Sequence, residues 1–319
     1  MDDIERRIGE IGIVPVVRLE DAGQAVELGK ALAAGGIPVA EITFRTKAAL
    51  PAIESLARDL PSLLIGAGTV TDAGQAADAL SAGARFIVSP AWVDEVVDFC
   101  LERGVPVLPG VSGPDGMAKG VARGLRLLKF FPAEALGGLA MLEALSGPFP
   151  GMRFVPTGGI DAGNIGAYAR RPFVHAVGGS WMVKSDAIAA HDWNGIARAC
   201  RQAVFALHGF SFAYMGLAAD DESAAAKTAE LLASLFGFSG RQTDGAIFAS
   251  DAIEVSARPR AEGKGRIAIR CNDVDRAVAR FRGLGLGTRP GSSTLRGGRT
   301  MTAALDLEIA GFAVLLVSA

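Results

Sequence analysis

The sequence predicts an α/β fold followed by a second, smaller α+β domain. From Ile11 to about His208, short β-rich segments alternate with alanine-rich helical segments. Eight such alternations in about 200 residues predict a (β/α)8 TIM barrel near the lower size limit of that fold. Beyond about Phe210 the pattern changes to a strand, a helix and further strands, and it occurs twice. We therefore expect a barrel over residues 1–207 and an α+β domain of paired βαβββ modules over 208–319.

The strands expected in the barrel are short and separated by helical segments. Segments such as Ala22–Ala34 have apolar residues three or four positions apart, which predicts helices, and several end in Gly, as helices often do. A doubly wound open sheet is the alternative. The barrel is favoured because eight strands are enough to close it, and because glycine doublets follow the last two strands, where such barrels commonly bind phosphate. The expected strands are Ile13–Arg18, Val39–Phe44, Leu63–Ala67, Arg85–Val88, Val105–Leu108, Leu125–Phe131, Arg153–Pro156 and Val174–Val177.

The second domain reads as two similar modules. Asp220–Asp221 and Asn272–Asp273 precede the two expected helices as comparable N-caps. The segment Gly287–Arg299, rich in Arg and Gly, is expected to be a loop. The first module comprises strand Phe212–Leu217, helix Glu222–Phe236 and strands near Ala246–Ala249 and Ile253–Ala257, and the second comprises strand Arg266–Arg270, helix Val274–Gly283 and strands near Ala303–Ile309 and Ala313–Val317.

Composition and charge exclude several classes of function. The chain has 319 residues, is 50% hydrophobic and has a net charge of −2, so it has no general attraction to nucleic acid or membranes. The charged N-terminus, Met1–Arg7, and the lack of a long apolar segment predict a cytoplasmic protein without signal peptide or anchor. Cys100, Cys200 and Cys271 lack the spacing of a disulfide framework or zinc site, so we expect reduced packing residues.

Lys129 is the most informative residue of the chain. It lies in a short apolar segment that predicts a buried strand, on the same face as Leu127 and Phe131. Burial disfavours the charged form of an amine, and a neutral amine at a strand end can attack a carbonyl carbon to form an iminium. The alternative is a lysine that reaches the rim of the barrel or pairs with a carboxylate.

Polar groups at other strand ends match this lysine. By strand alternation, Glu41, Thr43 and Arg45 share one face, where a carboxylate could transfer protons and a guanidinium could bind a carboxylate. A salt bridge between Glu41 and Arg45 that closes the barrel is the alternative. After the third strand, Thr69 could orient a carboxylate or carbonyl, and the alternative there is a simple turn whose Thr71 or Asp72 caps the next helix.

Glycine doublets follow the seventh and eighth strands. These are Thr157-Gly158-Gly159 and Gly178-Gly179-Ser180. Paired glycine turns expose backbone N–H groups at helix N-termini, which suits a phosphate. Tight turns between strands and helices also use Gly without binding any ligand.

Together these segments resemble the class I aldolase family that cleaves 2-keto-3-deoxy-6-phosphogluconate and 4-hydroxy-2-oxoglutarate. The resemblance runs in family order across residues 10 to about 205. After the fifth strand the chain departs from the family, with Val111–Gly116 in place of a Thr-rich turn and a helix-opening Glu, and this difference bears on substrate preference. The resembling segments are Glu41–Thr46, Gly66–Val70, Lys129–Glu134, Gly147–Pro150, Pro156–Gly159 and Gly178–Trp181.

The resemblance implies roles for individual residues. It implies that Lys129 forms the Schiff base, that Glu41 is the general acid/base, and that the reaction is retro-aldol cleavage to pyruvate and glyceraldehyde 3-phosphate. It also implies a homotrimer that needs no metal or cofactor and binds a small phosphorylated keto acid. The residues expected to bind substrate are Arg45 and Thr69 for the pyruvate carboxylate, Gly158, Gly159, Gly179 and Ser180 for the phosphate, and Phe131 and Thr157 beside them.

The second domain resembles the glyoxalase-like, or vicinal oxygen chelate, module. Tyr214 and Arg266 stand near the positions where that module often has metal-binding histidines, so metal binding is not expected. Glu254 and Glu308 are expected to lie on solvated strand faces. We expect a structural or effector-binding role for this domain.

Three alternatives to the gluconate aldolase remain. The substrate could be the galactonate derivative, which differs at one stereocentre. The barrel could be a metal-dependent sugar-phosphate epimerase, but His175, His191 and His208 do not form a convincing set of strand-end ligands. The third alternative is a catalytically idle phosphosugar sensor whose second domain provides the output.

Overall fold

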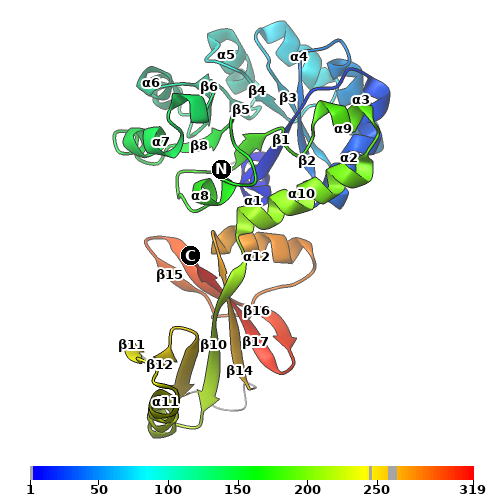
Figure 1. Ribbon diagram of the computed structural model, residues 1–319. Helices are drawn as coiled ribbons and strands as arrows, with labels where there is room; N and C mark the ends of the chain where they lie inside the picture. The colour runs from blue at the N-terminus through cyan, green and yellow to red at the C-terminus, as the bar shows by residue number, and fades with distance from the viewer. Residues whose placement is uncertain (1–2, 244–245, 258–263) are drawn as a thin grey trace. The chain divides into compact units, whose positions relative to one another are not determined.

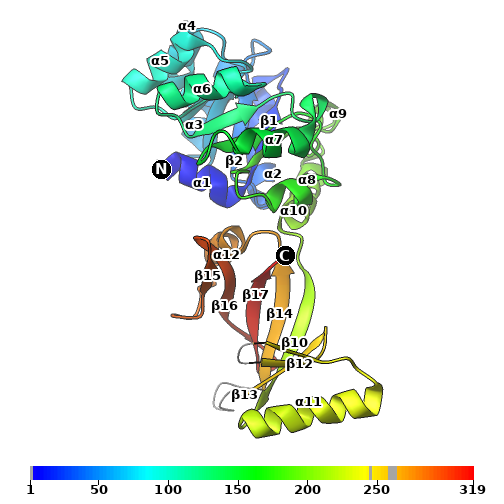
Figure 2. The ribbon, with the colours of Figure 1, turned by 90° about the vertical axis from the view of Figure 1, so that its left-hand side faces the viewer.

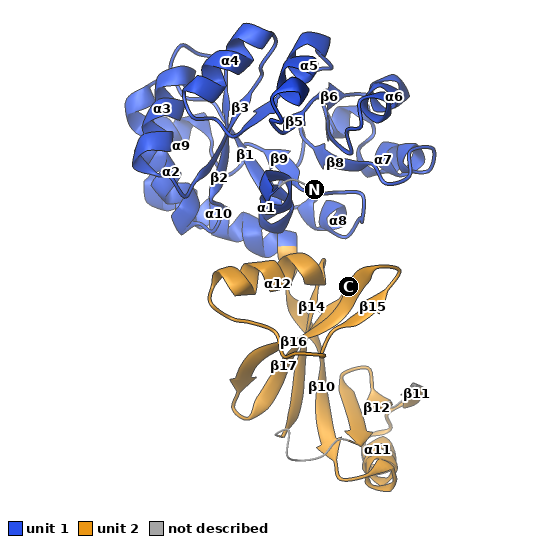
Figure 3. Ribbon diagram, turned by 180° about the vertical axis from the view of Figure 1, so that it is seen from behind, with its two compact units in different colours: residues 1–207 blue, residues 208–319 orange. Residues whose placement is uncertain are grey.

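The computed structural model describes residues 3–243, 246–257 and 264–319. The chain divides into two compact units, Met1–Leu207 and His208–Ala319 (Figure 3). Each unit has its own hydrophobic core. No helix in the described residues combines the length and the apolar character needed to span a membrane.

The first unit is built on a curled sheet of short parallel strands surrounded by helices (Figure 1). Its strands pair in the orders β5-β4-β3-β2-β1-β9 and β6-β7-β8. Two isolated β-bridges, Phe154 to Val174 and Thr157 to Gly178, connect the segment of β8 with the segment of β9. This arrangement confirms the predicted (β/α)8 barrel. The strands are β1 (Ile13–Val17), β2 (Val39–Thr43), β3 (Leu64–Gly68), β4 (Phe86–Val88), β5 (Val107–Leu108), β6 (Gly110–Val111), β7 (Leu127–Phe130), β8 (Arg153–Pro156) and β9 (Val177–Gly179).

Two strands of the first unit differ from the prediction by more than two residues at one end. The fifth strand is interrupted at Pro109, which divides it into β5 and β6; a proline supplies no N–H for strand pairing. The eighth predicted strand, which is β9, begins at Val177 rather than Val174. The intervening His175 is instead held by the backbone carbonyl of Glu5, 2.7 Å from its Nε2 atom, so this segment is tied to the first helix of the chain.

The helices cover the outside of this sheet. Asp72 caps the fourth helix by accepting a hydrogen bond from the backbone N–H of Gln75, as the sequence predicts. The helices are α1 (Asp3–Ile11), α2 (Ala25–Ala34), α3 (Ala49–Asp59), α4 (Ala73–Ser81), α5 (Asp94–Glu102), α6 (Pro114–Ala122), α7 (Gly138–Ser146), α8 (Ile165–Ala169), α9 (Ser185–Ala189) and α10 (Trp193–His208), with 3-10 turns at Ala22–Gln24 and Glu134–Leu136.

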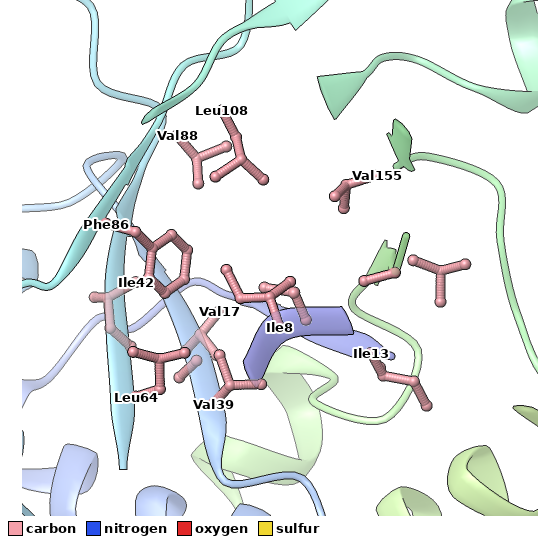
Figure 4. Packing of buried hydrophobic residues seen from close by; sticks show 14 of the residues in the cluster. Ile8, Ile13, Val17, Val39, Ile42, Leu64, Phe86, Val88, Leu108 and Val155 are labelled. Atoms are coloured by element: carbon pink, nitrogen blue, oxygen red, sulfur yellow. The ribbon is translucent and has the colours of Figure 1, made fainter. Parts of the chain in front are cut away.

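Apolar side chains fill the barrel below its polar end. Figure 4 shows residues of β1 to β5 and β8, with Ile8 of α1, in one buried cluster. Phe86 is fully buried, and its ring occupies the space that a Cβ atom on Gly66 would need. The three cysteines are free and buried, as predicted. Burial raises the pKa of Cys100 to about 11 and that of Cys200 to about 12.

The second unit contains one eight-stranded sheet in the order β11-β12-β13-β10-β14-β17-β16-β15. Strands β10, β14 and β17 run side by side at its centre (Figure 2). Each half has the predicted βαβββ order, with β10 parallel to β13 and β14 parallel to β17. The elements are β10 (Ser211–Ala219), α11 (Glu222–Phe236), β11 (Arg241–Thr243), β12 (Ala246–Ser250), β13 (Ile253–Ala257), β14 (Gly265–Cys271), α12 (Val274–Gly283), β15 (Thr294–Arg296), β16 (Arg299–Ile309) and β17 (Phe312–Ser318).

The prediction of a loop over Gly287–Arg299 is wrong in part. Thr294–Arg296 forms β15, which pairs antiparallel with the start of β16. The hydroxyl groups of Thr294 and Thr302 lie 2.7 Å apart across this hairpin. Glycines 297 and 298, both with positive φ, make the connecting turn, so the Gly-rich composition marks a hairpin rather than an unstructured loop.

Candidate active site

Lys129 and Glu41 meet inside the barrel although they are 88 positions apart in the sequence. Lys129 lies on β7 and Glu41 on β2, which stand on opposite sides of the ring of strands. The Lys129 Nζ atom is 3.1 Å from Glu41 Oε1 and 3.5 Å from Oε2. Lys129 is only 5% exposed and Glu41 only 3%, so water barely screens this interaction.

This geometry decides between the interpretations of the two residues. The alternative of a salt bridge between Glu41 and Arg45 is wrong, because Glu41 pairs with Lys129 and the Arg45 Nε atom donates a hydrogen bond to Thr69 Oγ1 over 3.2 Å. For Lys129, the alternative of a lysine paired with a carboxylate is confirmed. The pair nevertheless lies at the centre of a barrel, where the carboxylate can accept the proton that the amine must lose before it can act as a nucleophile.

Gly68 at the end of β3 makes room for the carboxylate. A Cβ atom on Gly68 would lie 2.3 Å from Glu41 Oε1 and 2.5 Å from its Cγ. No residue with a Cβ atom fits there unless the Glu41 side chain moves. The sequence analysis did not single out Gly68 for this contact, although the glycine pair Gly66 and Gly68 on one strand face was a usable signal.

We expect Gly68→Ala to displace Glu41 from Lys129 and to lower kcat by about tenfold to a hundredfold, as a misplacement of about 1 Å can do. Steady-state kinetics of aldol cleavage measure the effect. Gly283→Ala is the matched control, because an added Cβ there meets nothing within 4 Å and the residue ends α12 in the second unit. Equal kcat values for the two variants would mean that the position of Glu41 does not limit the rate.

Arg45 and Thr69 lie at the mouth of the barrel. Arg45 follows the end of β2 and is exposed, while Thr69 follows β3. Thr69 has a φ of 58°, which is rare for a β-branched residue and places its hydroxyl group beside the Arg45 guanidinium. The two side chains together present hydrogen-bond donors at one edge of the opening, as a carboxylate requires.

The glycine turns after β8 and β9 lie next to each other. Thr157, which is 5% exposed, pairs with Gly178 through an isolated β-bridge. A Cβ atom added to Gly178 would lie 2.2 Å from the Thr157 hydroxyl oxygen. Gly158 and Gly159 have φ angles of 99° and 80°, which favour glycine. Ser180, directly after β9, is exposed. The two turns therefore form one polar edge of the same barrel opening.

Phe131 lies beside Lys129, and Glu134 lies against the glycine turn after β8. The Lys129 Nζ atom lies 5.5 Å from the centre of the Phe131 ring. The Tyr168 hydroxyl group donates a hydrogen bond to Glu134 Oε1, and burial, with help from this carboxylate, raises the pKa of Tyr168 well above its usual range. Tyr168 was not predicted from the sequence because it lies on α8, far from any strand-end motif.

A barrel with a buried lysine and a carboxylate that meet at its centre is the arrangement of a lysine-dependent, class I aldolase. The family model "KDPG and KHG aldolase" matches residues 4–199. The chain belongs to this aldolase family. The match lies within the first unit, and the family model does not extend into the second.

Similar proteins agree with this membership. The 2-dehydro-3-deoxy-phosphogluconate aldolase of Pseudoalteromonas atlantica is 44% identical over 192 residues, covering 60% of this chain and 89% of that protein. The KDPG aldolase structure from Legionella pneumophila, with pyruvate captured as a covalent carbinolamine, is 41% identical, covers 62% of this chain and 96% of its own, and has a TM-score of 0.60. The Zymomonas mobilis enzyme with 3-phosphoglycerate is 35% identical, covers 63% and 95%, and also has a TM-score of 0.60.

Proposed function

We propose that the chain cleaves 2-keto-3-deoxy-6-phosphogluconate to pyruvate and glyceraldehyde 3-phosphate through a Schiff base on Lys129. The buried contact between Lys129 and Glu41 is the observation on which this proposal chiefly rests. The names of the similar proteins support it, as does the pyruvate carbinolamine in the Legionella structure.

In this mechanism Lys129 first transfers a proton to Glu41 and attacks the C2 carbonyl carbon of the substrate. The carbinolamine that forms loses water to give an iminium. Glu41, again ionised, takes the proton of the C4 hydroxyl group while the C3–C4 bond breaks, and the bonding electrons move into the iminium to give an enamine. Protonation of the enamine at C3 and hydrolysis of the resulting iminium release pyruvate and regenerate the lysine.

The polar edges of the barrel opening divide the substrate between them. We assign the carboxylate to Arg45 and Thr69, and Phe131 and Thr157 to the middle of the substrate. The glycine turns with Gly158, Gly159, Gly179 and Ser180 would receive the phosphate. This assignment is supported by the shared edge on which Thr157 and Gly178 lie and by the 3-phosphoglycerate in the Zymomonas structure.

Substrate preference is tested by the ratio of kcat/KM values for three substrates: the gluconate derivative, the galactonate derivative and 4-hydroxy-2-oxoglutarate. We expect the highest value for the gluconate derivative. A higher value for either competitor would assign the chain to that substrate instead. Borohydride trapping with pyruvate separates all three enzymes from an idle sensor, since only an iminium former becomes covalently labelled.

We expect chelation by EDTA to leave both kcat and Tm unchanged, because the proposed mechanism uses an iminium rather than a metal ion as the electron sink. Within residues 3–243, 246–257 and 264–319, no three His, Cys, Asp or Glu side chains come together as metal ligands. A metal bound to the folded chain would raise its stability. A fall in Tm or kcat on chelation, restored by added zinc or magnesium, would contradict this part of the proposal.

We propose a homotrimeric, cytoplasmic enzyme, as the family resemblance suggested. Size-exclusion chromatography with light scattering tests the trimer directly. The assignment of residues 208–319 to a glyoxalase-like domain is likewise a proposal, supported by the two βαβββ halves of its sheet.

A further inference from the structure

The second unit contains a cavity of about 630 Å³ on one face of its sheet. The opposite face packs against α11 through Ala219 and Val255 and against α12 through Val314 and Leu316. Because side chains alternate along a strand, the residues between these point to the other face. The cavity is lined there by strand residues of both halves and by the segment 289–292. Its volume lies within the range of pockets that hold small molecules.

A buried ion pair crosses the floor of this cavity. Glu254 on β13, Gly216 on β10 and Arg266 on β14 stand in one row across three neighbouring strands. The Arg266 Nε atom donates to Glu254 Oε2 over 2.9 Å, and its Nη2 atom donates to Oε1. Glu254 is 3% exposed, so the prediction of a solvated carboxylate is wrong for this residue.

Gly216 is what allows the pair to form. A Cβ atom on Gly216 would lie 2.6 Å from Arg266 Cγ and 2.9 Å from Glu254 Oε2. The ion pair therefore occupies the space above the glycine and fixes the Arg266 guanidinium beside the cavity. A guanidinium held in this way loses little conformational freedom when a ligand binds.

The lining of the cavity contains two guanidinium groups and several hydroxyl groups. It includes Arg266 and Arg289 but neither of their carboxylate partners, Glu254 and Glu308. Arg266 directs Nε and Nη2 to Glu254, which leaves Nη1 without a hydrogen bond to the residues that the structure describes. The remaining polar lining groups are the hydroxyl groups of Tyr214, Ser256, Ser292, Thr294 and Thr302.

We propose that this cavity binds a small organic anion. Two guanidinium groups and several hydroxyl groups suit a carboxylate or a phosphate ester, and the alanines, Leu315 and the Tyr214 ring would contact its carbon skeleton. The site is built entirely within the second unit and does not depend on the proposed reaction of the barrel.

The two tyrosines of the chain allow a test on the full-length protein. Tyr214 lines the cavity and Tyr168 lies in the barrel, so 3-fluorotyrosine labelling gives two ¹⁹F signals, assigned with Tyr214→Phe. We expect succinate or glycerol 3-phosphate to shift the Tyr214 signal to saturation, and glycerol, which lacks the anion, to leave it unchanged. The response to each anion distinguishes a carboxylate site from a phosphate ester site, and a shift of Tyr168 alone reports binding in the barrel.

Variants connect the shift to the guanidinium groups. Arg289→Gln should weaken binding at least about tenfold, because it removes one charge-assisted hydrogen bond to the anion. The double variant Glu254→Gln/Arg266→Gln removes both charges together and so avoids leaving a buried carboxylate alone. Arg296→Gln, an exposed arginine on β15 outside the lining, is the matched control and should bind as the wild type does. No Tyr214 shift with either anion at about 10 mM, a concentration well above the Kd of a specific site, or equal affinity in Arg289→Gln and the wild type, would overturn the proposal.

Discussion

Lys129→Ala is expected to abolish aldol cleavage and borohydride trapping by pyruvate, because it removes the only proposed nucleophile. It should also lower stability. The variant leaves Glu41, which is 3% exposed, without its cation, and an unpaired buried charge costs about 3–5 kcal/mol. Cleavage assays, mass spectrometry of the borohydride-treated protein and thermal unfolding measure the three effects.

Two further variants separate chemistry from stability. Lys129→Arg retains a positive charge beside Glu41 but cannot form an iminium, because a guanidinium stays protonated. It should be as inactive as Lys129→Ala while losing less stability. Lys119→Ala removes an exposed lysine that pairs with Asp94 on the surface, and it should leave cleavage and trapping unchanged. Normal turnover by either Lys129 variant would exclude the Schiff base at this position.

The sequence predicted the barrel and the residues around its opening because both follow from local patterns. Strand alternation identified Lys129 and Glu41 as residues on strand faces, and parallel strands bring their carboxyl ends to one edge. What it could not predict was the distance between them. That distance depends on Gly68, on a third strand, whose missing side chain leaves the space that Glu41 occupies.

The second unit was harder to predict for a similar reason. Its βαβββ order follows from local patterns, but the burial of Glu254 does not. The carboxylate is buried because Gly216 and Arg266 stand beside it in the same row, and this register joins three strands that are distant in sequence. Single-strand periodicity carries no information about which residues become neighbours across a sheet.

In the first unit, the break of the fifth strand at Pro109 was a local signal that the prediction did not use.

Glu41→Gln is expected to lower kcat by roughly 10²–10⁴-fold, the usual contribution of a general acid or base. Glutamine has almost the same shape as glutamate, so the variant keeps the space above Gly68 filled and still offers an oxygen to the Lys129 amine. It cannot accept the proton of the C4 hydroxyl group, and it cannot take the proton that Lys129 must lose.

The alternative for Glu41 is that it serves only to neutralise Lys129. In that case Glu41→Gln would lower Tm, because the buried amine would lose its counter-charge, yet kcat would be unchanged at a temperature where the variant is folded. Slow borohydride trapping on Lys129 together with a low kcat would instead place the defect in proton transfer. Glu95→Gln, which changes an exposed glutamate on α5 by the same atoms, controls for the substitution itself and should retain the wild-type kcat.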